Sequence, residues 1–503
     1  GVTARIAIDK LTFGPRPGLA AAIEARGVWG WIDDQLDPVG RNVAHAEQRV
    51  SGYTTLTNTH RQNYDVQDSD GGWDRIIEEL DHATIQRAVY SDRQLYEVMC
   101  DFWTNHFNTW RQKTWMTFLK NRSHETVVRP NALGKFSTML LASAQDTAML
   151  DYLDNLPSDA SQPGGVNENY ARELMELHTL GMVGGVQPFT EADVRGVAKI
   201  ISGWSINWDD TANRYNFRFN PWQHSRDAVT VLGGAFTRPA RTYGQGYDDG
   251  VRLVNLLAHH PTTARHIAWK LCRRFVSDTP SDALVTSAAA VFTANDTAIA
   301  PTLRHIFASP EFVAGHKKKV RRPFEHLVGA LRALDATMPT AAQTQTTDKL
   351  RATLENLGQP IFERHSPDGY PDVNTFWVSS EGFLQRWAMA GRLAAKVTLV
   401  EGTPAGDGTV PLRFTVEEGR VYTLAGLHVT GSAAGEEARL LRDVVTLRVG
   451  AAYGRAAVAE DVARIKVDHE SRGQQVWVTP RAVRDDARAT IELLEESHAH
   501  SDE

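Results

Sequence analysis

Cysteine is scarce in this chain, and its two positions lie far apart. Among 503 residues only Cys100 and Cys272 occur, so the CxxC spacing of many zinc and iron sites is absent. A metal site built on cysteine is therefore not expected. Both residues lie in apolar patterns of helical spacing, which predicts two buried free thiols. A single disulfide is the alternative in an oxidising compartment.

Long apolar runs and an excess of basic residues are also missing. No stretch approaches the roughly 20 apolar residues that cross a bilayer, so we expect no transmembrane segment. The net charge is -7 at pH 7. A general nucleic-acid binder needs a basic face to neutralise phosphates, so we expect no nucleic-acid partner. A GxSxG elbow, a Walker-type loop and a glycine-rich dinucleotide fingerprint do not stand out either.

The chain is long enough to require more than one core, and its composition changes near residue 400. Apolar residues recur at helical spacing through residues 1–400, with a long ordered loop expected at 205–250. Glycine and proline predict a linker at 401–409. Residues 410–495 read as a small α+β domain, and 496–503 as a disordered tail. The predicted fold is mainly α, a large multi-helix domain with long ordered loops followed by this small domain.

The small domain has a β-α-α-β-β order by pattern. Alternating apolar residues predict strands and intervening periodic stretches predict helices, in the order 410–416 with 422–431, 436–447, 455–472, 476–483 and 489–494.

The helix predicted at 167–181 is unusually rich in groups that can do chemistry. Its spacing places Asn169, Arg172, Glu173 and Glu176 on one face. Two carboxylates one turn apart beside an arginine suit acid/base catalysis, since one pKa can be raised and the other lowered. Asn169 and Arg172 are candidate substrate-binding groups. The alternative is an Arg–Glu network that braces a buried helix.

His178 follows on the opposite side of the same helix. A histidine there is either a hydrogen-bonded core residue or a metal ligand. The spacing from Glu173 and Glu176 matches neither the Glu-x-x-His nor the His-Glu-x-x-His pattern of known metal helices.

An aromatic stripe at 101–110 carries His106 within it. This histidine is a candidate catalytic base or metal ligand, and a role in filling the core is the equal alternative. Trp103 and Asn105 on the same segment are candidate substrate-binding residues.

The segment 216–234 places a histidine close to an acid among aromatic residues. His224 is a candidate acid/base group, and Trp222, Arg226 and Asp227 are candidate substrate contacts, together with Trp204 just upstream. Thirteen tryptophans beside acids, amides and arginines are typical of a sugar-binding cleft. Aromatic packing that pins the loop is the alternative.

A basic run at 317–322 precedes Pro323. It indicates a solvated face or, as a second interpretation, an anion-binding rim for an acidic polymer.

Two resemblances add to these patterns. The motifs LTFGPRPG, DFWTNHFN, NENYARELMELHTLG, FTEADVRGVAKIISGW and GQPIFERHSPDGYPDVNTFW resemble the bacterial family catalogued as domain of unknown function 1800, over residues 1–395. This resemblance implies an exported, mostly helical protein of the periplasm or cell surface. The tail, with FTVEEGRVYTLAGLHVTG, resembles a POTRA domain over about 410–495, which implies a protein partner bound by strand addition.

Three functions are consistent with these features. The first is an enzyme of hydrolase or lyase type that cleaves an envelope or extracellular carbohydrate polymer, with Glu173 or Glu176 as acid or base and His106 and His224 as partners. The second is a metal-dependent oxidase or hydrolase, with ligands drawn from His106, Glu173, Glu176, His178 and His224. The third is a non-enzymatic envelope scaffold that uses its C-terminal domain. The sequence names no cofactor.

Overall fold

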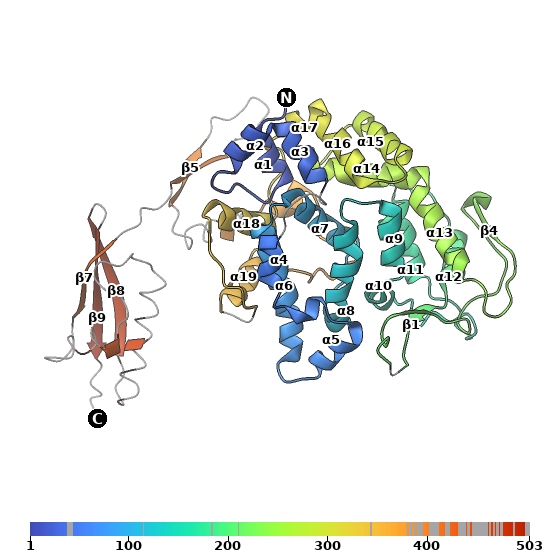
Figure 1. Ribbon diagram of the computed structural model, residues 1–503, viewed down its shortest axis with the longest axis horizontal. Coiled ribbons are helices and arrows are strands. Elements are labelled where there is room, and N and C mark those ends of the chain that lie inside the picture. Colours follow the sequence, from blue (N-terminus) through green and yellow to red (C-terminus); the bar gives the residue numbers. More distant parts are fainter. Residues whose placement is uncertain are drawn as a thin grey trace. The chain divides into compact units, whose positions relative to one another are not determined.

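The computed structural model is a mainly helical protein that divides into two compact units, Gly1–Arg386 and Trp387–Glu503 (Figure 1). It describes residues 1–37, 44–113, 115–182, 185–209, 211–342 and 345–379 without a break. Beyond these it describes residues 382, 385, 386 and 389, five strands, and a few single residues between 439 and 472. Among the described residues, no helix combines the length and the apolar character needed to cross a membrane.

The first unit is built from helices that follow one another with short connections. In its N-terminal half these are α1 (Ala4–Leu11), α2 (Leu19–Arg26), α3 (Val28–Leu36), α4 (Ala44–Val50), η1 (Thr54–Leu56), α5 (His60–Gln67), α6 (Gly72–Tyr90), α7 (Gln94–His106), α8 (Met116–Ser123), η2 (His124–Val128), η3 (Arg129–Asn131), α9 (Phe136–Ala144) and α10 (Thr147–Tyr152). The helices of its second half are α11 (Asn169–Glu173), η4 (Leu174–Thr179), α12 (Glu191–Ile201), η5 (Leu232–Gly234), α13 (Tyr247–His259), α14 (Pro261–Phe275), α15 (Asp282–Ala294), α16 (Ile299–Ala308), α17 (Pro310–Ala314), α18 (Pro323–Ala333), α19 (Gln345–Asn356) and α20 (Asn374–Trp377).

Local chemistry explains where two of these helices begin. Thr190 accepts a hydrogen bond from the backbone of Asp193, whose side chain accepts one from the Thr190 backbone, so α12 starts with a capping box. Helix α14 starts at Pro261 with the His260 ring accepting from Thr262 N. The helix predicted at 167–181 has a different form, because α11 passes into η4, which is a π-helix. It ends at Gly181, whose φ of 70° is in the left-handed region.

The region 205–250 is more regular than the predicted loop. It contains the antiparallel pairs β1 (Trp204–Ile206) with β2 (Phe217–Phe219), and β3 (Val229–Val231) with β4 (Phe236–Arg238). Apolar residues at both ends of β3 are buried and Thr230 between them is exposed, the alternation of a half-buried strand.

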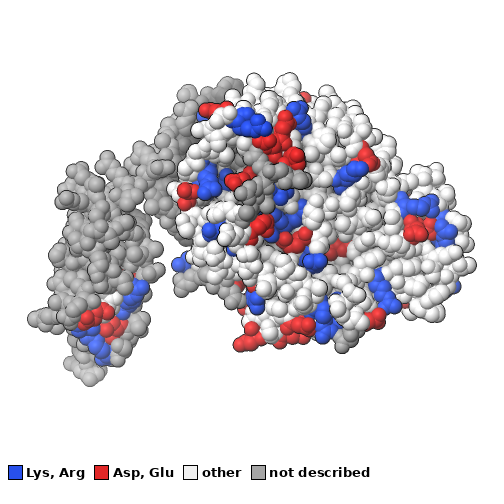
Figure 2. Space-filling view, viewed as in Figure 1, with Lys and Arg blue, Asp and Glu red and all other residues white. Residues whose placement is uncertain are grey.

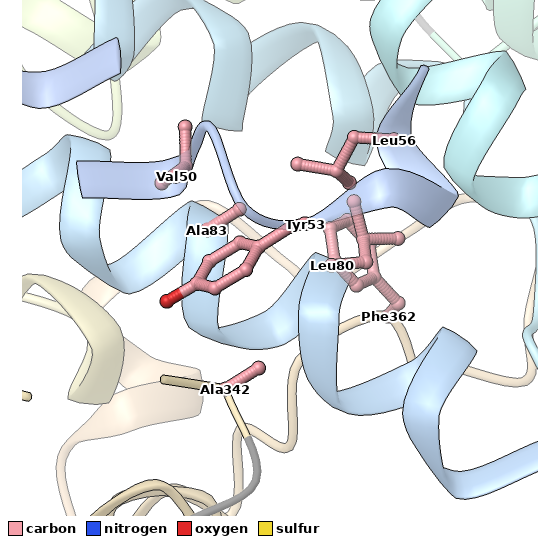
Figure 3. Close-up of a cluster of buried hydrophobic side chains, with 7 residues drawn as sticks. All are labelled: Val50, Tyr53, Leu56, Leu80, Ala83, Ala342 and Phe362. Atoms are coloured by element: carbon pink, nitrogen blue, oxygen red, sulfur yellow. The ribbon is translucent and has the colours of Figure 1, made fainter. Parts of the chain in front are cut away.

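One core cluster anchors the segment that later enters the candidate site. Buried side chains from α4, η1, α6 and three connecting segments pack together, namely Val50, Tyr53, Leu56, Leu80, Ala83, Ala342 and Phe362 (Figure 3). Phe362 also accepts a backbone hydrogen bond from Arg111 N, 3.2 Å away. Its burial therefore fixes the start of the chain that runs on through residues 363–373.

Surface charge on the first unit is mixed. On the face in Figure 2, Lys and Arg lie interspersed with Asp and Glu, with wide uncharged areas between them. Cys100 and Cys272 are buried free thiols, as predicted. Burial raises the pKa of each to about 12, so both stay protonated at neutral pH.

The second unit contains β-structure. Strand β5 (Lys396–Glu401) pairs antiparallel with β6 (Leu412–Glu417), and a three-stranded sheet has the order β7 (Thr423–Thr430), β9 (Arg488–Ser497), β8 (Val476–Asp485). Strand β7 is parallel to β9, and β8 is antiparallel to it. Residues 396–400 were expected to end the helical domain and Glu401 to begin the linker, but together they form strand β5. Apart from single residues, the predicted linker at 401–409, the helices at 436–447 and 455–472 and the tail at 496–503 lie outside the described residues, as does most of the turn before β7.

Candidate functional site

A cleft of about 380 Å³ in the first unit gathers titratable side chains from segments far apart in the sequence. Its walls come from α7, η4, α14, the residue before α18, and the segment 368–373. The lining residues that carry polar groups are Asn105, His106, His266, Trp269, Lys270, Arg273, Arg274, Arg322, Asp368, Tyr370 and Asp372.

Helix α14 supplies the largest share of this wall because it is amphipathic. Its Ile267, Leu271 and Phe275 face the core and are at most 1% exposed. The opposite side presents His266 and Lys270, one turn apart, to the cleft, with Trp269 and Arg273 beside them. The sequence thus sets which α14 side chains share a face, and packing sets what they meet.

Lys270 is the group with the most altered chemistry in the cleft. Its Nζ donates a hydrogen bond to His106 Nδ1 at 2.8 Å. Burial, opposed by Asp372 and Asp368 and reinforced by Arg273, lowers the pKa of Lys270 to about 8. Within the described chain no carboxylate lies at ion-pair distance from its ammonium. A sizeable fraction of Lys270 is therefore a neutral amine just above physiological pH.

His106 holds this lysine and is itself neutral. The ring is 2% exposed, and burial, with Lys270 and two further histidines, keeps the pKa of His106 well below its usual range. Since Nδ1 accepts from Lys270, the proton is assigned to Nε2, which donates to the backbone oxygen of His178 at 3.2 Å. His106, predicted as an acid/base group, thus orients the amine of Lys270.

Two more neutral histidines surround the pair. Burial lowers the pKa of His178 and of His266 to about 3. Neither ring nitrogen of His178 reaches a hydrogen-bond partner in the described part of the protein. The His266 ring lies so close to Gly181 that a Cβ there would sit 2.2 Å from Nδ1. The glycine that ends η4 is therefore also required by the cleft wall.

The segment 365–373 is fastened to α7 by Asn105. The side-chain amide donates to Tyr370 O at 2.8 Å, and its oxygen accepts from Tyr370 N at 2.7 Å. At Gly369, with φ of 74°, a Cβ would lie 2.3 Å from Asn105 O. Asn105, predicted to bind substrate, therefore clamps the loop that brings Asp368 and Asp372 to the cleft.

The two loop carboxylates differ in their partners. Asp372 forms an ion pair with Lys319 at 2.9 Å, and the positive charges of Lys319, Arg274 and Arg322 outweigh its burial and lower its pKa. Asp368 is exposed, with Arg364 3.9 Å away. Asp368 is thus the carboxylate of this segment that is open to a ligand.

Of the two glutamates predicted as catalytic, Glu173 has the altered environment. It is partly buried, and burial together with Glu176 and Asp368 raises the pKa of Glu173 against the opposing effect of Arg172. Glu173 lies one helical turn before Leu177, which lines the cleft. Glu176 accepts a hydrogen bond from Gln187 Nε2 at 3.0 Å.

Arg172 and Asn169 point to other partners. Arg172 donates to both oxygens of Glu191, at 2.8 and 2.6 Å, and lies 3.9 Å from Glu168. The expected pairing with Glu176 is replaced by these contacts across to α12. Asn169 is exposed and donates to Asp154 at 3.3 Å.

The predicted tryptophans do not line the cleft. Trp103 and Trp204 are 0% exposed, and Trp103 Nε1 donates to Ala132 O at 3.0 Å. Trp222 is 68% exposed and packs against Tyr243, with ring centroids 4.6 Å apart. The aromatic wall of the cleft is instead Trp269, with the guanidinium of Arg273 4.4 Å above its ring.

His224 and its neighbours lie in a separate, well-bonded loop. His224 Nδ1 donates to Ser202 O at 2.6 Å, and Nε2 accepts from Arg238 at 3.0 Å. Asp227 pairs with Lys199 at 2.6 Å, and Arg226 is exposed. None of these side chains lines the cleft. The structure therefore separates His224 from His106 and Glu173.

The candidate metal ligands are not gathered around one point. No cluster of three or more His, Cys, Asp or Glu suited to hold a metal ion occurs among the residues that the structure describes. His106 and His178 have ring centroids 6.0 Å apart, and the ammonium of Lys270 lies 2.8 Å from His106 Nδ1.

Sequence reasoning missed the residues that give the cleft its chemistry. Lys270 and His266 were not among the predicted site residues, although their i,i+4 spacing on the polar face of a helix was an available signal. Asp368 and Asp372 stand in the segment HSPDGYPD, where Gly and Pro beside two acids are typical of a shaped loop.

The chain belongs to the family described as "Protein of unknown function (DUF1800)", whose model matches residues 6–491. The match continues past residue 395, where the resemblance seen in the sequence ended, and so includes most of the second unit. No curated protein and no solved structure matches the chain.

Proposed function

We propose that the protein is an enzyme that uses Lys270 of this cleft as a general base and Glu173, one helical turn before the lining residue Leu177, as a general acid. The observation that carries the proposal is the shift of both groups away from their ordinary titration. Burial lowers the pKa of the lysine to about 8 and raises that of the glutamate. Acid/base catalysis uses such a pair, an amine whose pKa is lowered towards neutrality and a carboxyl whose pKa is raised.

The roles follow from the contacts. The neutral amine of Lys270 removes a proton from the substrate or from a water molecule, while His106 keeps its lone pair in place. Glu173 donates a proton to the oxygen of the leaving group, and both groups are restored by proton exchange with solvent. Asn105 acts as a positioning residue by holding the loop that carries Asp368.

We further propose that the substrate is a carbohydrate polymer of the cell envelope or the extracellular space. What supports this is the cleft wall itself. The Tyr370 ring adds an aromatic surface to the cleft, and Asp368 and Arg273, whose guanidinium lies over the Trp269 ring, can bond sugar hydroxyl groups. An exported location rests on the resemblance of the chain to an exported family, and cell fractionation tests it.

The proposal is tested with a panel of acidic and neutral polysaccharides. New reducing ends report hydrolysis, and new reducing ends with ultraviolet absorbance of an unsaturated sugar report elimination. Lys270→Met is expected to lower turnover by about 10²–10⁴-fold, and Lys270→Arg, which stays charged, by a similar factor. Lys199→Met is the matched control, because Lys199 forms an ion pair outside the cleft. Full turnover in folded Lys270→Met would refute the assignment of Lys270 as the general base.

The acid is assigned by a second pair of variants. Glu173→Gln is expected to lower turnover by about 10²-fold or more, whereas Glu176→Gln leaves it within a small factor. The reason is that burial raises the pKa of Glu173, whereas the carboxylate of Glu176 accepts a hydrogen bond from Gln187. The reverse order would transfer the acid role to Glu176.

A second candidate function rests on the three-stranded sheet of the second unit. Strands β7 and β8 each pair only with β9 among the described strands, so each has an edge that a partner strand could extend. We propose that residues 410–495 form a POTRA-like module that recruits an envelope partner. The double variant Thr479→Lys with Ala482→Lys on β8 would then fail to restore the phenotype of a strain that lacks the protein, whereas Lys270→Met would restore it. The enzyme proposal expects the opposite pattern.

A further inference from the structure

A second cavity, of about 270 Å³, lies in the first unit where the basic run 317–322 meets α1 and the end of α14. Its charged lining comprises five cations and two carboxylates, namely Lys10, Arg274, Lys317, Lys319, Arg321, Asp9 and Glu325. Cations thus outnumber anions in a concave site, which favours a negatively charged ligand.

Lys10 is held in this cavity by a preformed arrangement. Its Nζ donates to the backbone oxygens of Phe275 and Val276, at 2.8 and 3.4 Å, where α14 ends. The ammonium lies 5.0 Å from the Phe312 ring centroid. A Cβ at Gly315 would come within 3.0 Å of Nζ, so the glycine leaves the room that the ammonium needs.

The carboxylates around the cavity already have partners. Asp9 bonds His316 at 2.6 Å, and Glu325 pairs with Arg274. Lys319 is matched by Asp278 and Asp372, at 2.8 and 2.9 Å. These ion pairs leave the positive charge of the remaining lysines uncompensated.

Two lysines therefore carry the excess charge. Lys10 and Lys317 have no carboxylate at ion-pair distance among the residues that the structure describes. Burial and the neighbouring Arg274 and Lys319 lower the pKa of Lys10 to about 8, against the opposing effect of Asp9. Lys317 is exposed at the rim and has a φ of 64°, an uncommon conformation for a lysine.

We propose that this cavity binds an oxyanion of the phosphate or sulfate class, with Lys10 at its base and Lys317 at its rim. A tetrahedral oxyanion can accept hydrogen bonds from several ammonium groups at once. The cavity is several times larger than the roughly 30 Å³ that a water molecule occupies. It therefore has room for a group attached to the anion, so the oxyanion can be a free ion or an ester on a larger molecule. This inference stands apart from the catalytic proposal.

The test is isothermal titration calorimetry on the full chain with inorganic phosphate, sodium sulfate and a phosphorylated sugar, at constant ionic strength. Saturable binding of the inorganic ions identifies a free-ion site. Binding of the phosphorylated sugar alone identifies an ester site. Either result supports the proposal, and binding no stronger than that of chloride for all three probes overturns it.

Variants locate the binding. Lys10→Met is expected to weaken it by about ten- to a hundredfold, as for loss of a hydrogen bond to a charged group. Lys317→Asn removes the rim charge and suits the left-handed backbone, so it keeps the proposal testable if Lys10→Met fails to fold; it is expected to weaken binding by a few fold. Lys199→Met, outside the cavity, is the matched control. Wild-type affinity in both folded test variants would overturn the assignment.

Discussion

Two π-helices in the first unit carry one buried histidine each, and they stand in opposite electrostatic surroundings. In η2, His124 bonds Glu125 at 3.2 Å, and Glu125 in turn pairs with Arg87 at 2.6 Å. In η4, the ring nitrogens of His178 have no hydrogen-bond partner in the described chain, and the ring lies beside that of His106 next to the cleft. The π-helix η2 thus lies in a network of paired charges, here called the saturated network. The π-helix η4 lies beside groups that lack such partners in the described chain.

The difference identifies which π-helix belongs to a site. Around η2, Arg129 pairs with Glu97 at 2.7 Å and lies 3.9 Å from Glu125, so charges inside the protein are matched by opposite charges. Beside η4 lies the cation of Lys270, whose ammonium has a neutral ring, that of His106, as its one hydrogen-bond partner among the described residues. A network with all partners internal stabilises the fold, whereas groups left without partners are available to a ligand.

The largest expected effect comes from breaking the saturated network. Arg129→Met leaves Glu97 buried without its partner, and it is expected to lower the free energy of unfolding by about 3–5 kcal/mol. Urea unfolding at pH 7 measures it. Arg195→Ala is the control, because its pair with Glu168 is exposed and its loss should cost no more than about 0.5 kcal/mol. An equal loss of unfolding free energy in Arg129→Met and Arg195→Ala would contradict the idea that the buried network stabilises the fold more than an exposed ion pair.

Removing the charge of Lys270 should raise the free energy of unfolding, whereas the loss of Arg129 should lower it. Lys270 has a pKa of about 8 in the folded state and 10.5 as its ordinary value. Below pH 8 it is charged in both states, so the folded state bears the cost of burying it. The stability of the wild type therefore rises between pH 8 and 10.5, by up to about 3 kcal/mol at 1.36 kcal/mol per pH unit. The ionisable groups facing Lys270 are His106, His178, His266, Arg273, Asp368 and Asp372.

Lys270→Met isolates this contribution. The variant should equal or exceed the wild type at pH 7, and its advantage should vanish by about pH 10.5. Urea unfolding at intervals of one pH unit measures the difference, and Lys199→Met should show no such trend. A difference that stays constant with pH would mean that Lys270 is not desolvated.

The two histidines provide a smaller test. His124→Leu removes a hydrogen bond to a buried carboxylate and is expected to cost about 1–2 kcal/mol. His178→Leu removes a ring without partners and should be neutral or mildly stabilising at pH 7. Since His178 has a folded pKa of about 3 against 6.5, wild-type stability falls as the pH drops below 6.5, and His178→Leu should fall less steeply. Unfolding at pH 7 and pH 5 distinguishes the two.

The smallest effect is expected at Arg172. Its bonds to Glu191 are exposed, so Arg172→Ala should change the free energy of unfolding by less than about 1 kcal/mol. Turnover should remain within about twofold, since Arg172 does not line the cleft. A large loss of turnover with unchanged stability would restore Arg172 to the substrate-binding group.

Local sequence patterns predict structure best where the interactions join residues that are close in the sequence. Thr190 and Asp193, three positions apart, form a capping box at the start of α12, and α14 begins at Pro261, a residue favoured in the first turn of a helix. The helix chosen at 167–181 does border the cleft, but the spacing assumed for an α-helix does not hold through its π-turn. Its face therefore could not be assigned correctly by counting at 100° per residue.

Contacts between distant segments were beyond such patterns. Lys270 and His106 are separated by 164 positions, and their hydrogen bond depends on how α14 packs near α7. His224 looked as suitable as His106 by its neighbours, yet Ser202 and Arg238 bond both of its nitrogens. Residue type identified candidates, and only their partners distinguished them.

The sequence by itself determined the helical class, the helix caps, the polar face of α14 and the family of the chain. It did so because hydrogen-bonded turns and amphipathic faces depend on residues three or four positions apart. The tertiary structure alone decided that Lys270 is desolvated against His106, that Asn105 clamps the loop of Asp368, and that Lys10 has no carboxylate partner among the described residues. A pKa and an ion pair depend on burial and on charges from other segments, which no local pattern encodes.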